Sequence, residues 1–153
     1  MERIYFIIIL IGLLFIGCIN NTEINNAEEI KQNTTTETSL KTIEKLEIIH
    51  FHGDYQCSSC ITVGNYAEET VNTYFKNELE SGLIEFKHIN GQLKENEILV
   101  MRYGASGSSL WIGTYYKNGD FETEENIKVW YKTNNKNDYL AYLKDVIEKK
   151  LNN

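Results

Sequence analysis

Hydrophobic and polar positions divide the 153-residue chain into three parts. Residues 1–18 are almost entirely apolar and end in Gly17-Cys18. Residues 19–43 are rich in Asn, Thr and Glu, and they contain no aromatic residue. From residue 44 on, apolar positions recur at the regular spacings of strands and helices. We therefore expect an export signal over residues 1–18, a flexible polar tether over 19–43 and one folded domain over 44–153.

Two periodicities alternate within the predicted domain. Apolar and polar residues alternating at every second position, together with β-rich composition, predict strands over residues 45–52, 83–90, 109–116 and a segment within 121–131. Apolar positions three and four residues apart predict helices over residues 57–81, 92–103 and 138–151. Asn118-Gly119 predicts a two-residue hairpin, and Asn137 or Asp138 is the expected N-cap of the last helix.

The order of these elements predicts the fold class. Two successive strand–helix–strand units favour parallel pairing through right-handed crossovers, and the hairpin adds an antiparallel pair. We therefore expect an α/β fold in which helices flank both faces of a mixed four-stranded sheet.

The strongest chemical signal lies between the first strand and the first helix, in the stretch HFHGDYQCSSC. Unpaired N–H groups at a helix start stabilise a thiolate, so Cys57 is the predicted attacking thiol. Cys60 lies one turn further and can resolve the mixed disulfide. A bond that closes such a short loop removes little chain entropy, so a purely structural disulfide is a poor alternative.

With this motif, the chain resembles the thioredoxin-like superfamily over residues 44–151. Residues 103–110 and 117–120 look like the end of the second helix, the cis-proline loop and the hairpin of thioredoxin. Residues 52–60, 80–85 and 128–130 look like the ArsF family, a small thioredoxin-like group whose members are often exported or tethered. The resemblance implies a thiol-disulfide oxidoreductase that needs no organic cofactor. Its partner would be another thiol or disulfide protein or a membrane electron donor.

Two departures from thioredoxin bear on the site. The cis-proline position falls at Ser109, after Ser108, and a cis bond before a non-proline residue costs about 2.5–4 kcal/mol. We therefore expect a trans bond or a reshaped loop. The resemblance assigns substrate contact to this loop, which makes Ser108 and Ser109 candidate contacts, and Tyr55 is a candidate aromatic contact for a partner. Where thioredoxins keep a buried Asp, the first strand offers His50 and His52, and a histidine could transfer protons there.

Two other functions remain open. His50 and His52 lie on one side of the predicted strand, so His52 or His50 together with Cys57 and Cys60 could bind or deliver copper or zinc. The chain could also bind a partner through this surface while the cysteine pair stays idle. His88 has no expected role beyond its strand, and Glu68 and Glu69 are expected on an exposed helix face.

The leader and the net charge bear on location and partners. The apolar run from Ile4 to Ile16 reaches about 20 Å as a helix, short of the roughly 30 Å hydrocarbon core of a bilayer. An export signal therefore fits better than a membrane-spanning helix. Phe15-Ile16-Gly17-Cys18 resembles a lipoprotein lipobox, which implies lipid on Cys18. An uncleaved anchor and an ordinary secretory signal are the alternatives, and all three place the domain outside the cytoplasm. The net charge of -7 argues against nucleic-acid binding, and we expect a monomer.

Overall fold

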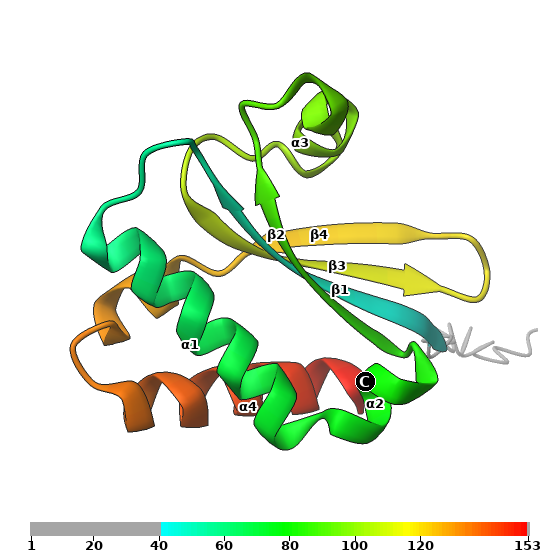
Figure 1. Cartoon of the computed structure of the whole chain (residues 1–153). Helices are drawn as coiled ribbons and strands as arrows, with labels where there is room; N and C mark the ends of the chain where they lie inside the picture. Colours follow the sequence, from blue (N-terminus) through cyan, green and yellow to red (C-terminus); the bar gives the residue numbers. More distant parts are fainter. Residues whose placement is uncertain (1–40, 153) are drawn as a thin grey trace, which may run out of the picture. The chain divides into compact units, whose positions relative to one another are not determined.

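A computed structural model describes residues 41–152 of the chain (Figure 1). The predicted signal, most of the predicted tether and Cys18 lie outside the described residues. The elements follow the order β1 (Ile43–His52), α1 (Ser58–Tyr74), α2 (Lys76–Ser81), β2 (Ile84–Asn90), the 3₁₀ helix η1 (Lys94–Asn96), α3 (Glu97–Tyr103), β3 (Ser109–Tyr116), β4 (Phe121–Glu125), the 3₁₀ helix η2 (Ile127–Lys132) and α4 (Lys136–Leu151). Within residues 41–152, no helix is both long and apolar enough to span a bilayer.

The four strands form one mixed sheet in the order β2-β1-β3-β4. β1 and β2 are parallel, and β3 pairs antiparallel with both β1 and β4. This arrangement confirms the expected α/β, thioredoxin-like fold with a four-stranded mixed sheet.

The predicted parallel pairing of the second strand–helix–strand unit is wrong, because β3 runs antiparallel to β1. The connection between the two strands, residues 91–108, holds η1, α3 and loops, and it does not carry the chain back along the sheet. Its α-helix, α3, covers about 10 Å, whereas the strand β2 covers about 23 Å. β3 therefore starts at the end of the sheet where β2 stops. That is also the end where β1 delivers the chain to the cysteine pair.

Helices cover both faces of the sheet, as Figure 1 shows with α1 and α4 on one side and α3 on the other. The larger core lies under α1 and α4, where residues such as Leu46, Ile48 and Ile112 meet Val63 and Leu143. The smaller core lies under α3 and consists of Ile49, Phe51 and Tyr103, with partly buried side chains around them. Because side chains alternate along β1, its even positions face α1 and its odd positions face α3.

Three predicted helix boundaries differ from the structure. The first helix breaks at the buried residue Phe75 (φ -128°, ψ 35°), where α1 gives way to α2. The second helix begins with η1, and only its last part is α-helical. The N-cap of α4 is Asn135, whose side chain accepts a hydrogen bond from the Asp138 backbone N–H at 3.2 Å. Neither Asn137 nor Asp138 caps this helix.

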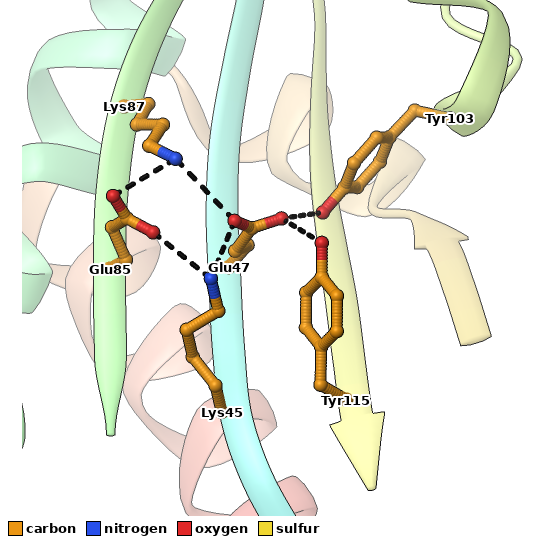
Figure 2. Close-up of polar contacts among 6 residues, drawn as sticks. All are labelled: Lys45, Glu47, Glu85, Lys87, Tyr103 and Tyr115. Atoms are coloured by element: carbon orange, nitrogen blue, oxygen red, sulfur yellow. Dashed lines mark hydrogen bonds and ion pairs between the residues drawn. The ribbon is translucent and has the colours of Figure 1, made fainter. Parts of the chain in front are cut away.

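A buried carboxylate organises the α3 face of the sheet (Figure 2). Glu47 on β1 is 5% exposed. Its oxygens accept hydrogen bonds from Tyr103 Oη at 2.8 Å and Tyr115 Oη at 2.7 Å. Lys45 Nζ at 2.9 Å and Lys87 Nζ at 3.4 Å supply the balancing charge. This set, the Glu47 cluster, joins three strands to the end of α3.

Candidate redox site

The cysteine pair lies at the exposed end of the sheet, where the loop after β1 enters α1. Cys57 is the N-cap of α1, with extended backbone angles (φ -72°, ψ 162°), and it forms a disulfide with Cys60. The Cys57 sulfur also accepts a hydrogen bond from the Cys60 backbone N–H at 3.1 Å. Cys57 is exposed and Cys60 is half-buried. The sequence therefore placed both cysteines correctly, one at the helix start and one a turn inside.

This geometry gives the two sulfurs different chemistry. When the Cys57–Cys60 disulfide is reduced, the free N–H groups of the first turn and the helix dipole favour negative charge on Cys57 Sγ. An exposed thiolate is the species that attacks a disulfide. The half-buried Cys60 is less accessible to an outside molecule, yet it is already within bonding distance of Cys57. The arrangement is compatible with thiol-disulfide exchange.

Behind the first turns of α1 lies His50, a histidine that is only 1% exposed. Its Nδ1 lies 3.0 Å from Nδ1 of His88, and its Nε2 lies 3.5 Å from Ser108 Oγ. Gly64 makes this packing possible, because a Cβ at that position would overlap the His50 ring. α1 therefore presses directly on the ring, one turn beyond Cys60.

The environment of His50 keeps its ring neutral. Burial lowers the pKa of His50, and like-charge repulsion from the nearby rings of His88 and His52 adds to this effect, so the pKa falls from 6.5 to about 4. A hydrogen bond with the Cys60 backbone acts in the opposite direction but is outweighed. At neutral pH the ring can therefore accept or donate a hydrogen bond without carrying charge.

His88 and Glu68 are the residues that sequence reasoning missed. His88 lies directly opposite His50 in the parallel register of β1 and β2. Its other ring nitrogen, Nε2, lies 3.3 Å from Glu68 Oε2 on α1. The side chains of His88 and Glu68 are 35% and 49% exposed, so the series His50–His88–Glu68 leads from the interior to solvent. The alternation of Ile84, Phe86 and His88 could have indicated that His88 shares a face with the sheet core.

His52 takes no part in this series. Its ring lies 5.6 Å from that of His50, on the same side of β1 as expected, and its Nδ1 bonds locally to the Gly53 carbonyl at 2.9 Å. Within residues 41–152, no three His, Cys, Asp or Glu side chains are grouped so that they could hold a metal ion.

The predicted contact residues occupy three different environments. Tyr55 is 98% exposed in the loop before Cys57. Ser108 is half-buried and points its hydroxyl towards His50. Ser109 is 1% exposed, opens β3 opposite Phe51, and accepts a hydrogen bond from Trp111 Nε1 at 3.0 Å. No peptide bond within the described range is cis, so the bond before Ser109 is trans, one of the two expected outcomes.

A small apolar pocket of about 220 Å³ adjoins the loop that carries the cysteines. It lies between that loop and the α3 side of the sheet end. Its walls come from several loops and include Phe51, His52, Gly53, Gln92, Val100, Ala105 and Gly107.

A scan against protein-family models finds no model that matches the chain. A search of curated proteins likewise finds no significant match. The case for function therefore depends on the geometry of the site itself.

Proposed function

We propose that this protein is a thiol-disulfide oxidoreductase of the thioredoxin-like superfamily, which exchanges disulfides through Cys57 and Cys60. The observation that carries the proposal is the Cys57–Cys60 disulfide at the N-terminus of α1, with the outer sulfur exposed and bonded to a backbone N–H. In the exchange, the Cys57 thiolate attacks a partner disulfide and releases one partner thiolate. Cys60 then attacks Cys57, closes the intramolecular disulfide and releases the second thiolate.

Location and partner belong to the same proposal. The lipobox-like sequence before Cys18 supports a lipid-tethered domain outside the cytoplasm, where disulfides persist. The exposed Tyr55 and the apolar pocket lined by His52 and Gly53, at the start of the same loop, support a protein or peptide partner that docks at this end of the sheet. The narrower ArsF assignment rests on the sequence resemblance alone.

The decisive experiment is an equilibrium titration of the full processed protein against glutathione or dithiothreitol redox buffers. We expect a reduction potential of about -270 to -120 mV, the range of known oxidoreductases. We also expect Cys57 in a Cys60→Ser variant to react with iodoacetamide at pH 7 much faster than Cys60 reacts in a Cys57→Ser variant.

The same titration with one equivalent of copper or zinc distinguishes the metal-binding alternative from disulfide exchange. Tight stoichiometric binding that blocks alkylation of both cysteines would favour a metal carrier. A potential far below the stated range would instead identify an inert disulfide and contradict the exchange function.

A further inference from the structure

Three residues tie the loop before the cysteine pair to the end of the neighbouring strand. The Asp54 backbone N–H donates to Gln92 Oε1 at 2.8 Å, and the Gln92 backbone N–H donates to Asn90 Oδ1 at 3.0 Å. Asn90 Nδ2 completes the cycle by donating to Asp54 Oδ1 at 2.6 Å. Each of the three residues therefore donates one hydrogen bond and accepts one. We call this set the loop clamp.

The strand register determines where the loop clamp forms. Asn90 is the last residue of β2 and lies opposite His52, the last residue of β1. Just beyond this pair, the Gly91 N–H donates to the His52 carbonyl at 2.8 Å. Gly53 leaves room for the contact, because a Cβ at that position would lie only 3.3 Å from Gln92 Oε1. The loop clamp thus continues the pairing of β1 and β2 into the loop.

The base of the loop clamp is itself held in place by η1. Asn96 Nδ2 donates to the Asn90 carbonyl at 2.8 Å, and the Leu93 N–H donates to the same carbonyl at 3.3 Å. Asn90 is therefore fixed both by its backbone and by its side chain, and the loop is bonded to a rigid part of the domain.

Beyond Asp54, the loop has no other anchor before α1 begins. Within residues 41–152, neither Tyr55 nor Gln56 takes part in a hydrogen bond. Cys57 is held by α1, since its carbonyl accepts a hydrogen bond from the Ile61 N–H at 3.0 Å. The loop clamp therefore holds the chain directly before Tyr55, whereas α1 holds Cys57.

Tyr55 is the side chain that this arrangement presents to the outside. It is 98% exposed, more than any other large hydrophobic side chain that the structure describes. Such a ring buries its apolar surface only when a partner covers it, and tyrosines are frequent anchors of protein–protein contacts. Tyr55 lies two residues before the attacking sulfur. A partner protein joined to Cys57 can reach the ring, whereas a small disulfide ends near the sulfur.

We propose that Asp54, Asn90 and Gln92 are positioning residues that hold Tyr55 ready to dock a partner protein, an inference that rests on the exchange function proposed above. A loop that is ordered before binding avoids the entropy cost of being ordered during binding. The loop clamp therefore raises the affinity for protein disulfides and leaves the reactivity of the Cys57 thiol unchanged. It makes the site selective for disulfides carried by proteins over small ones.

Two sets of variants of the full processed protein test the loop clamp. Gln92→Ala removes the acceptor of the Asp54 N–H, whereas Gln92→Glu keeps an oxygen there and is the conservative control. Asn90→Asp sets two carboxylates against each other. Adding Asp54→Asn to that variant restores one donor, one acceptor and the wild-type net charge. Thermal melts check folding, and hydrogen-exchange mass spectrometry of residues 53–57 reports whether the loop has been released.

Kinetics with two probes separate docking from thiol reactivity. Each reduced protein is mixed with insulin, a protein disulfide, or with dithiobis(nitrobenzoate), a small one, and the rate is measured against probe concentration. We expect the half-saturating insulin concentration to rise about 10-fold in Gln92→Ala and in Asn90→Asp, the factor that ordering one backbone residue costs. The limiting rate and the rate with the small probe should be unchanged. Gln92→Glu and the double variant Asp54→Asn/Asn90→Asp should match wild type.

Tyr55→Ala distinguishes positioning of the ring from a general effect on the loop. This variant should raise the half-saturating insulin concentration by about the same factor. Adding Gln92→Ala to it should cause no further rise, because the ring that the loop clamp positions is already gone.

Several results would overturn the loop clamp. These are loop exchange and insulin kinetics equal to wild type in Gln92→Ala and Asn90→Asp, an equal slowing with both probes, or no recovery in the double variant Asp54→Asn/Asn90→Asp. An effect of Gln92→Ala that persists without Tyr55, or a wild type that does not saturate with insulin, would overturn it too. A wild type that reacts with neither probe would instead refute the exchange function itself.

Discussion

At the scale of single residues, two buried titratable side chains of β1, three positions apart, face opposite sides of the sheet. His50 faces α1 and stays neutral, whereas Glu47 faces α3 and stays charged. Their neighbours explain the difference. Burial, together with two neighbouring imidazoles, disfavours the charged form of His50, while Glu47 accepts hydrogen bonds from two tyrosines and two lysines. A sequence pattern reports which face a residue occupies, but not which donors meet it there.

The Glu47 cluster should make stability depend on acid pH. Burial alone would raise the pKa of Glu47, but hydrogen bonds from Lys45, Tyr115 and Tyr103 outweigh it and lower the pKa from 4.5 to about 2. Because the folded state has the lower pKa, this stabilisation is complete above about pH 4.5 and is lost as the pH falls towards 2. A difference of this size corresponds to about 3 kcal/mol.

Urea denaturation between pH 2.5 and 6 checks this prediction. Glu47→Gln should be less stable than wild type at pH 6, and its stability should fall less steeply below pH 4.5. Glu85→Gln is a suitable control, because Glu85 bonds to the same lysines but is 41% exposed. Equal pH slopes for wild type and Glu47→Gln would contradict the assignment.

At the scale of elements, the start of α4 offers a direct comparison between sequence and structure. Asn135 caps the helix, while Asn137 lies inside the first turn and is exposed. Asn135→Ala should lower the free energy of unfolding by about 1 kcal/mol, because the Asp138 N–H loses its acceptor. Asn137→Ala should be neutral or slightly stabilising, since Ala is the better helix former. Chemical denaturation of both variants checks the pair, and an equal loss in both would show that Asn135 is not the cap.

Periodicity predicted the elements better than it predicted their connections. The strand and helix segments with regular apolar spacing lie where the sequence placed them, because local burial determines them. The direction of β3 and the break at the buried Phe75 involve contacts between segments far apart in the sequence. The cysteines were identifiable because their spacing is local. The His50–His88 contact was not, because it depends on the register between two strands that are far apart in the sequence.

At the scale of the whole molecule, the two cores should confer unequal stability. α1 and α4 share the larger core, whereas α3 is anchored mainly through Tyr103 and leaves Ile98 (82%) and Met101 (74%) exposed. Local unfolding requires the least free energy where few apolar side chains are buried. Backbone amides of α3 should therefore exchange with deuterium about tenfold faster than the central amides of α1 and α4. Hydrogen-exchange mass spectrometry of the oxidised protein checks this, and uniform protection across the three helices would contradict it.

The placement of the disulfide also determines the order in which the site can be assembled. Cys57 and Cys60 are three residues apart, so their bond can close in a chain that has not yet folded. The contacts of His50 with His88 and Ser108 join residues 38 and 58 positions apart, and they require the finished sheet. A closed disulfide is therefore no proof of a native domain. An oxidised but unfolded chain would hold its disulfide before it had the groups that surround it, so assays of folding in this protein should follow the buried histidine and not the thiols.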